Sequence, residues 1–319
     1  MKCRKSPVSV VIVTFQSAEV IATCVQHAIQ AAEEVIVVDN HSQDATLERV
    51  RRFASVKVIA SSRNLGFAGA VNQGVAAASQ PNVLLLNPDA ILLEGLEDLV
   101  RALEQPGVGA VSGRLCDASG RFQLGFGVRR LPTAGALALE CLGWNRLFAE
   151  NAVNRRYRHL DFDPELAQEV EQPAGAFLLF RKEVHAALGG FDERFYPLWF
   201  EDVDFCKRLK DRGLKILYEP KARAIHQGAH SVGKLTWEHK VQYWYASLLG
   251  YSVKHFTRPG VVMVAVAVAG GAVIKALLGI FALHSLKPVW IYGKVIRLAC
   301  RYLFPPVTTA TKAVLEKHS

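Results

Sequence analysis

Apolar segments of strand length alternate with helix-forming segments through the first part of the chain, and this alternation restricts the fold more than any other feature. Strands are expected at Val8–Phe15, Glu34–Asp39, Val56–Ala60 and Asn82–Leu86, and helices at Ile21–Ala31, Thr46–Phe53 and Phe67–Ala78. Strands that are apolar throughout must be covered on both faces, and strands that alternate with helices form a parallel sheet. The sequence therefore predicts an α/β protein with a Rossmann-like, mostly parallel sheet flanked by helices.

Polar residues follow each of these predicted strands. They are Thr14, the run Asp39–Asp44, the run Ser62–Asn64 and Asn87–Asp89. Ligands of open α/β sheets bind beyond the carboxyl ends of the strands, so four such clusters on one edge indicate a binding site. Any one of them alone could be an ordinary turn, because Asn, Asp, Ser and Pro often end strands.

Two common nucleotide sites are excluded by the glycine pattern. The turn after the first strand, Gln16–Glu19, has no glycine, so the dinucleotide fingerprint is missing, and the sequence contains no P-loop. Glycines stand instead in Asn64–Gly69, where the amides at the start of a helix could receive phosphate charge. A nucleotide ligand is expected, but not a dinucleotide or an ATP-hydrolysis site.

Eight short motifs in order extend this pattern over roughly residues 8–230. They are Ser9–Phe15, Val38–Asp44, Asn64–Gly74, Leu84–Ala90, Gly175–Arg181, Gly190–Glu193, Glu201–Leu209 and His226. In order and spacing the chain resembles the inverting family-2 glycosyltransferases of the GT-A fold. Within that family it is most similar to the branch that contains bacterial rhamnosyltransferases.

The resemblance implies a nucleotide-sugar site on this edge. Thr14 and Asp39 match positions that hold the base and ribose. Arg63 and Asn64 lie where the diphosphate is approached. The full implied set is Thr14, Asp39, Arg63, Asn64, Asn72, Asn87 and Asp89.

The resemblance also implies a divalent metal, Mg²⁺ or Mn²⁺, held by Asp89 and His226. Asn87-Pro88-Asp89 stands where the family places its D-x-D motif, but the first acid is an amide here. Only Asp89 is then a hard anionic ligand, which leaves tight metal binding open. Either ion would suit an oxygen site completed by pyrophosphate and water.

Three acids, Glu201, Asp202 and Asp204, open a helix that is expected to end near Arg212. Sugar transfer needs a base on the acceptor hydroxyl, and we assign Asp202 as that base, with Glu201 as its neighbour and acceptor contact. The alternative is that these acids have a structural role. Acidic side chains in the first turn interact favourably with the helix dipole, and Asp204 can form an ion pair with Arg208 one turn later.

The basic charge of the chain is concentrated in its tail. The whole chain carries +9, and Tyr251–Ser319 has nine Lys and Arg against one acid, Glu316. A neutral body argues against a nucleic-acid partner, and a basic tail favours an anionic lipid surface. Gly260–Leu283 is apolar except for Lys275, so residues 254–304 are interpreted as a monotopic anchor on the cytoplasmic side of the membrane. A membrane-crossing helix and a core or oligomer helix remain alternatives.

These observations predict a catalytic domain over residues 1–235 and a helical, membrane-associating region over 236–319. The catalytic domain would comprise a nucleotide-sugar half, 8–113, and an acceptor half, 114–235. The expected reaction is single displacement, with L-rhamnose from dTDP-rhamnose moved to a cell-envelope, polysaccharide or lipid-linked saccharide acceptor. A UDP- or GDP-sugar donor, a non-catalytic nucleotide- or lipid-binding scaffold, and a homo-oligomer stay open.

Overall fold

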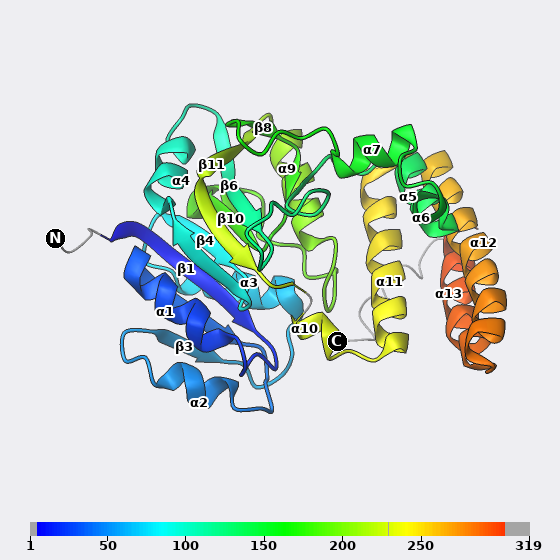
Figure 1. Cartoon of the computed structure of the whole chain (residues 1–319), viewed down its shortest axis with the longest axis horizontal. Helices are drawn as coiled ribbons and strands as arrows, with labels where there is room; N and C mark the ends of the chain where they lie inside the picture. The colour runs from blue at the N-terminus through cyan, green and yellow to red at the C-terminus, as the bar shows by residue number, and fades with distance from the viewer. Residues whose placement is uncertain (1–4, 229, 304–319) are drawn as a thin grey trace. The chain divides into compact units, whose positions relative to one another are not determined.

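The computed structural model describes residues 5–228 and 230–303 (Figure 1). The chain divides into two compact units. We call Met1–Leu131, Arg158–Glu193 and Glu201–Lys234 the sheet unit, and Pro132–Tyr157, Arg194–Phe200 and Leu235–Ser319 the helical unit. The catalytic and membrane-associating roles expected for residues 1–235 and 236–319 remain predictions. The last part of the expected membrane region, 304–319, lies outside the described residues.

Over the residues that the structure describes, the sheet unit is built from eleven strands and the helices between them. Its strands are β1 (Ser6–Thr14), β2 (Ala32–Asp39), β3 (Lys57–Ala60), β4 (Asn82–Leu86), β5 (Ala90–Glu94), β6 (Val108–Cys116), β7 (Val128–Arg129), β8 (Gln168–Val170), β9 (Gln172–Pro173), β10 (Phe177–Arg181) and β11 (Lys215–His226). Its helices are α1 (Ile21–Ala31), α2 (Thr46–Arg51), α3 (Gly66–Ala77), α4 (Leu96–Leu103), α8 (Lys182–Ala187), α9 (Glu201–Asp211) and α10 (His230–Gly233).

The main sheet has the strand order β3-β2-β1-β4-β10-β6-β11-β5, with β8 beside β11. As predicted, β1 to β4 are parallel. β10 runs antiparallel between β4 and β6, while β11 is parallel to β6 and antiparallel to β5. The carboxyl ends of β1–β4, β6 and β11 therefore share one edge with the amino ends of β5 and β10. We call this the carboxyl edge.

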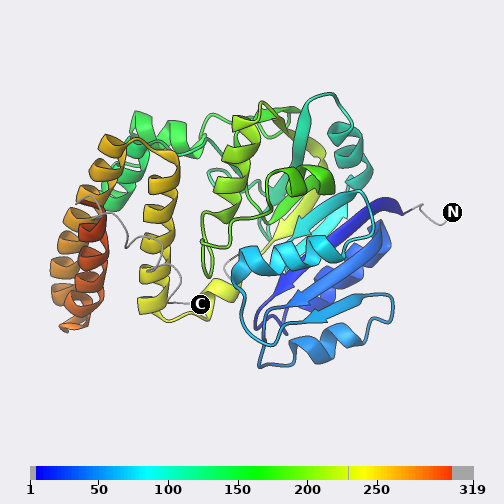
Figure 2. The same ribbon diagram turned by 180° about the vertical axis from the view of Figure 1, so that it is seen from behind.

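Helices cover both faces of the sheet. Successive side chains of β1 point to opposite faces, so this strand contributes to a separate core on each face. Val10 and Ile12 join a core with α1 and α4, whereas Val11 and Val13 join a second core with α3, α8 and α9. Figures 1 and 2 show the two faces. α3 packs closely on β1, since a Cβ on Gly74 would lie 2.4 Å from a methyl group of Val11. A mostly parallel sheet flanked by helices confirms the predicted fold class.

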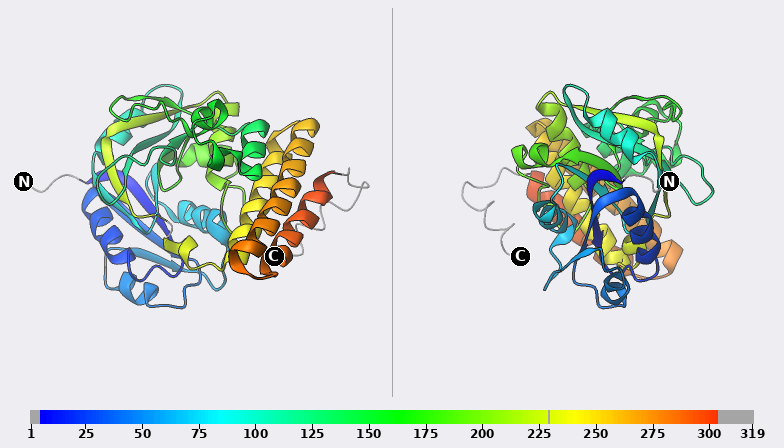
Figure 3. Two further views of the ribbon diagram at one scale, coloured as in Figure 1. Left: turned by 45° about the vertical axis from the view of Figure 1, so that its right-hand side comes forward. Right: turned by 90° about the vertical axis from the view of Figure 1, so that its left-hand side faces the viewer.

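The helical unit is formed by α5 (Ala134–Leu142), α6 (Trp144–Leu147), α7 (Ala152–Arg158), α11 (Trp237–His255), α12 (Arg258–Leu283) and α13 (Lys287–Leu303). The last residue of α7, Arg158, is counted with the sheet unit. α11, α12 and α13 pack against one another, and α5 packs on α12 (Figure 3). Thr236 caps α11 by accepting a hydrogen bond from the His239 N–H at 3.3 Å. Within residues 5–228 and 230–303, α12 is the one helix long and apolar enough to cross a membrane by length and composition. Inside the structure, 44% of its most apolar stretch is buried.

Lys275 interrupts the apolar sequence of α12, and the structure gives its ammonium group two partners. It donates to the carbonyl of Cys141 at the end of α5 and to the hydroxyl of Tyr245 at 3.2 Å. A cation at a helix C-terminus satisfies carbonyls that lack a partner within the helix. This charge therefore joins α12 to α5 and α11 inside the helical unit.

Candidate active site

The nucleotide end of the predicted site lies where β1 and β2 finish side by side. Thr14 and Asp39 are opposite each other in the parallel register, and both are buried. The Thr14 hydroxyl donates to Asp39 Oδ1 at 2.9 Å, and the Ser42 N–H donates to Asp39 Oδ2 at 2.9 Å. A carboxylate has about four acceptor positions, so Asp39 is fixed in place and can still accept from a ligand hydroxyl.

The loop after β3 is held to the end of β2 by Asn40. Its Nδ2 donates to Asn64 Oδ1 at 2.9 Å and to the Gly66 carbonyl at 3.1 Å, and its Oδ1 accepts from the Leu65 N–H at 2.7 Å. Asn64 is thereby brought beside the end of β2, as the sequence predicted. Arg63, the residue before it, is exposed.

Asn72 lies on α3, and its side-chain amide is used within the protein. Its Nδ2 donates to the Phe191 carbonyl and to Glu193 Oε1, both at 2.9 Å. Its Oδ1 accepts from the Phe191 N–H at 2.8 Å and lies 3.0 Å from Nε2 of His185. In the described part of the chain, these contacts join α3 to the segment before α9 and involve no other predicted site residue.

Asp89 and His226 meet at the carboxyl edge, where β11 pairs with β5. Both are buried, and Asp89 Oδ1 lies 3.4 Å from His226 Nε2. Asn87 Nδ2 is 3.3 Å from the same nitrogen. Two predicted site residues, Asp89 and Asn87, therefore lie beside one imidazole nitrogen of a third, His226.

Gln123 fixes the orientation of His226. Its Nε2 donates to the His226 carbonyl at 2.8 Å, and its Oε1 lies 3.2 Å from His226 Nδ1. An amide oxygen only accepts, so Nδ1 carries the proton and Nε2 presents its lone pair toward Asp89 and Asn87. Phe126 stacks on the imidazole with ring centroids 5.4 Å apart.

Asp202 reaches the same edge through the chain that enters β10. The Gly175 N–H donates to Asp202 Oδ2 at 3.0 Å, and the adjacent Ala176 carbonyl accepts from the Asn87 N–H at 3.0 Å. A dipeptide therefore connects the predicted base to the segment that bears Asp89. A Cβ on Gly175 would lie 3.0 Å from Cβ of Asp202, so only glycine leaves this approach unstrained.

Glu201, one residue earlier, is buried at the start of α9. Burial, and then the charge of Asp202, raise the pKa of the Glu201 carboxyl well above its usual value. Its Oε2 is buried without a partner among the described residues. Burial beside Asp202 therefore favours the protonated form of Glu201.

The family model for glycosyl transferase family 2 matches residues 9–188, which is more than half of the chain. The chain belongs to glycosyl transferase family 2. The expectation drawn from the eight motifs is confirmed, and the protein is a glycosyltransferase.

One relative shares 31% identity with this family 2 enzyme over 217 residues, covering 63% of this chain and 68% of the relative. It is the N-acetylglucosaminyl-diphospho-decaprenol L-rhamnosyltransferase of Mycobacterium tuberculosis. This similarity supports the rhamnosyltransferase-like branch.

Solved structures show the same fold at low identity. S. aureus TarS, residues 1–349, in complex with UDP-GlcNAc, matches with a TM-score of 0.56 and 14% identity, covering 93% of this chain and 81% of that one. The mannosyltransferase PcManGT of Pyrobaculum calidifontis, in complex with GDP-Man and Mn²⁺, matches with a TM-score of 0.52 and 19% identity, covering 94% and 83%. At these identities the likeness concerns the GT-A fold alone.

The side chains at Asp89 fit a divalent cation that is shared with a substrate. In the described residues no group of three or more His, Cys, Asp or Glu side chains gathers for a metal. Two potential ligands do converge: the Asp89 carboxylate and the lone pair of His226 Nε2, which Gln123 directs. Mg²⁺ and Mn²⁺ commonly take one or two protein ligands and complete their shell with phosphate oxygens and water.

Three residues of this arrangement were not assigned roles from the sequence. Gln123 lies in a segment with no recognisable motif, and nothing local indicates that it holds His226. Gly175 stood inside a matching motif, and Asn40 inside a polar run, so a local signal existed for both. Their parts become visible only when β2, β10 and β11 are placed in one sheet.

Proposed function

We propose that this enzyme transfers L-rhamnose from dTDP-rhamnose to a saccharide carried on a lipid diphosphate, with inversion at the anomeric carbon. The observation that carries the proposal is the contact of Asp202 with Gly175, next to the Ala176–Asn87 hydrogen bond. These contacts support the proposal because they link Asp202 to the edge of the sheet that bears Asn87 and Asp89. The printed activity of the mycobacterial relative supports the choice of sugar and acceptor.

In the proposed step, Asp202 takes the proton of an acceptor hydroxyl. The hydroxyl oxygen then forms a bond to the anomeric carbon on the face opposite the leaving group. The bond from that carbon to the diphosphate oxygen breaks, and its electron pair stays on the nucleotide diphosphate. Glu201, the neighbour of Asp202, would contact the acceptor.

The donor would lie along the carboxyl edge. Thr14 and Asp39 would hold the base and ribose, and Arg63 and Asn64 would approach the diphosphate. Asp89 and His226 would hold Mg²⁺ or Mn²⁺, which would stabilise charge on the leaving oxygens. Asn72 is included in the proposed site because of the resemblance alone. Its side chain contacts Phe191 and Glu193, so it would hold this part of the protein in place rather than bind the donor directly.

Membrane association is the second part of the proposal. α12, the turn after it and the start of α13 carry exposed large apolar side chains, and the surface of a soluble protein rarely exposes so many together. They are Met263, Val266, Val273, Ile274, Leu277, Leu278, Phe281, Leu283, Leu286, Val289 and Trp290, which we call the apolar face. Because the opposite side of α12 is buried against α5 and α13, we propose that the helix lies on the cytoplasmic surface of the membrane rather than crossing it.

The proposal is tested by measuring nucleotide diphosphate release from dTDP-rhamnose, UDP-sugars and GDP-sugars. Each donor is incubated with Mn²⁺, Mg²⁺ or EDTA and with N-acetylglucosaminyl-diphospho-lipid in detergent. Release from dTDP-rhamnose that needs the acceptor and stops in EDTA is expected, and NMR of the product should show inversion. Release from a UDP- or GDP-sugar but not from dTDP-rhamnose would exclude dTDP-rhamnose as the donor. Retention of configuration at the anomeric carbon would exclude single displacement.

Asp202→Asn should lower kcat about 10²–10⁴-fold while leaving donor binding near wild type. Asp211→Asn is the matched control, because it makes the same change at the other end of α9. Full turnover in Asp202→Asn would exclude this residue as the base.

A further inference from the structure

Phe126 is an exposed aromatic residue beside the residues proposed to hold the metal. It lies between β6 and β7, and its side chain is 39% exposed. Its ring stacks on the imidazole of His226, with centroids 5.4 Å apart and planes 9° from parallel. The guanidinium carbon of Arg129 lies 5.6 Å from the centroid of the same ring. Part of an apolar ring is therefore open to solvent next to the proposed site of the leaving diphosphate.

The turn that carries Phe126 is fixed by Gln123. The backbone carbonyl of Gln123 accepts from the N–H groups of Phe126 and Gly127, at 3.0 and 2.8 Å. The side chain of Gln123 contacts both the backbone and the imidazole of His226. Gly125 permits this turn, because it adopts a left-handed φ of 75°. One residue therefore holds both partners of the stacked pair, and the ring keeps its place relative to the imidazole.

The same turn is tied to the segment that holds the proposed base. The Gly127 carbonyl accepts from the Ala174 N–H at 3.0 Å, beside the pairing of β7 with β9. The next residue, Gly175, donates to Asp202. All of these residues belong to the sheet unit. Phe126 is thereby connected both to the proposed metal ligand and to the proposed base.

This position has a consequence for the transferred sugar. In a single displacement, the anomeric carbon lies between the leaving diphosphate and the acceptor hydroxyl, so the sugar would occupy this part of the carboxyl edge. L-rhamnose carries a methyl group at C6, where an ordinary hexose carries a hydroxymethyl group. A phenyl ring has no hydrogen-bonding atom. Contact with it suits a methyl group and leaves a hydroxyl without a partner.

We infer that Phe126 contacts the C6 methyl group of the donor sugar and determines specificity for a 6-deoxy sugar. The inference rests on the proposed function, and it gives a role to a segment in which no motif is recognisable. Selection would come from a difference in affinity, because a 6-hydroxyl group would lose water at the ring and gain no partner. The contacts of Gln123 hold the ring in place before the donor binds.

The test compares binding of dTDP-L-rhamnose and dTDP-L-mannose, which differ only by the hydroxyl at C6. The full chain is used in detergent, with Mn²⁺ and without acceptor. Both donors carry the same diphosphate, so a change at the metal residues cancels in the ratio of the two dissociation constants. Wild type should prefer dTDP-L-rhamnose about tenfold or more, and Phe126→Ser should lower this preference to about threefold or less.

Two further variants control for the loss of the ring. Phe126→Leu keeps an apolar side chain and should keep most of the preference. Leu166→Ser removes an apolar side chain that is 58% exposed and precedes β8. β8 pairs with the amino-terminal part of β11, whereas His226 ends that strand, so this variant should have the wild-type ratio. Binding of dTDP by each variant shows that its nucleotide site is folded.

A wild-type ratio near one would overturn the inference, as would an equal preference in Phe126→Ser and wild type. An unchanged ratio together with a raised acceptor KM would also overturn it, since the ring would then contact the acceptor. In each of these cases, turnover of dTDP-L-rhamnose would leave the proposed function standing. Turnover of a UDP- or GDP-sugar but not of dTDP-L-rhamnose would instead defeat the proposed donor, and the inference with it.

Discussion

At the scale of single residues, Gly175 sets the position of the proposed base. Its N–H donates to Asp202, and a Cβ on Gly175 would lie only 3.0 Å from Cβ of Asp202, so an added side chain would push Asp202 away. Gly175→Ala should lower kcat about ten- to a hundredfold, because small displacements of a catalytic group have effects of this size. The donor KM should change little, and steady-state kinetics with saturating acceptor measures both.

Gly135→Ala provides the control for that substitution. Gly135 lies in α5, and nothing stands within 4 Å of the Cβ it would gain. Its activity should equal that of wild type. If Gly175→Ala also retained full kcat, the tight approach to Asp202 would have no catalytic importance.

Glu201 should make stability depend on pH in the opposite direction to a salt-bridged acid. Its folded pKa lies well above the usual 4.5 because of burial and the charge of Asp202, so the folded state holds a proton that the unfolded state releases. Stability should therefore be complete below about pH 4.5 and fall as pH rises toward the folded pKa, by up to about 1.4 kcal/mol per pH unit. Glu201→Gln should remove this loss, which urea unfolding between pH 5 and pH 8 would detect.

The control is Glu183→Gln, an exposed position on α8. It alters net charge by the same amount and should follow the wild-type curve. A Glu201→Gln curve parallel to wild type over this range would contradict a raised pKa for Glu201.

Gln123 should govern metal affinity without touching the metal. It directs the lone pair of His226 Nε2 by accepting from Nδ1, and partners of this kind typically account for 10–100-fold in affinity. Gln123→Met should weaken Mn²⁺ binding by about that factor in the presence of dTDP, measured by EPR of free Mn²⁺. Gln123→Glu keeps an acceptor for Nδ1 and should restore most of the affinity. Unchanged binding in Gln123→Met would exclude this role.

At the scale of elements, the contact between α5 and α12 depends on one of two adjacent glycines. A Cβ on Gly271 would lie 2.1 Å from the Cys141 carbonyl oxygen, whereas one on Gly270 would make an ordinary 3.7 Å contact with Leu142. Gly271→Ala should destabilise the helical unit by about 1–3 kcal/mol through overpacking. Gly270→Ala should stabilise it by up to about 1 kcal/mol, because alanine favours a helix interior. Thermal unfolding of the two variants would then shift in opposite directions, and equal shifts would contradict the close contact.

The elements also show what local sequence can and cannot predict. α1 and β4 have the bounds that the apolar pattern predicted, Ile21–Ala31 and Asn82–Leu86, because strand and helix periods are local properties. Thr14 and Asp39 could be predicted to lie on one edge, because each ends a strand and the carboxyl ends of neighbouring parallel strands lie together. The pairing of β10 with β4 and β6, and of β11 with β5, depends on contacts distant in sequence. Gly175 and Gln123 acquire their partners only through that pairing.

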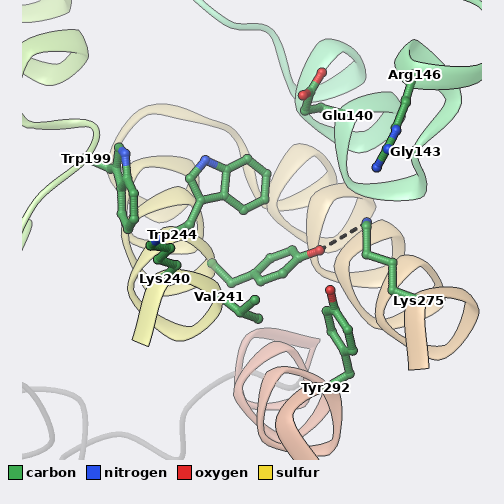
Figure 4. A pocket seen from close by; sticks show the side chains of 10 residues that line it. Glu140, Gly143, Arg146, Trp199, Lys240, Val241, Trp244, Lys275 and Tyr292 are labelled. Atoms are coloured by element: carbon green, nitrogen blue, oxygen red, sulfur yellow. Dashed lines mark hydrogen bonds between the residues drawn. The ribbon is translucent and has the colours of Figure 1, made fainter. Parts of the chain in front are cut away.

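At the scale of the whole molecule, fewer cations are available to a lipid surface than the tail's composition suggests. Arg258 donates to the carbonyls of Tyr302 and Leu303, Lys294 pairs with Glu238 at 2.7 Å, and Lys275 donates to the Cys141 carbonyl and the Tyr245 hydroxyl (Figure 4). The remaining cations of α13, Lys287, Arg297 and Arg301, are exposed. Electrostatic attraction from the described part of the tail should therefore be modest, about 1 kcal/mol for each exposed cation.

Membrane binding should consequently depend more on the apolar face than on charge. Leu278 and Phe281 are 64% and 77% exposed, and burying such a side chain in lipid contributes about 1.5–3 kcal/mol. Leu278→Glu/Phe281→Glu should lower partitioning to phosphatidylglycerol vesicles at least a hundredfold, whereas 0.5 M salt should lower wild-type partitioning much less. Leu124→Glu/Leu166→Glu makes the same change at exposed positions of the sheet unit and should bind vesicles as wild type does. If salt released the wild-type protein while the α12 variant still bound, attraction through the basic residues rather than insertion of the apolar face would hold the enzyme at the membrane.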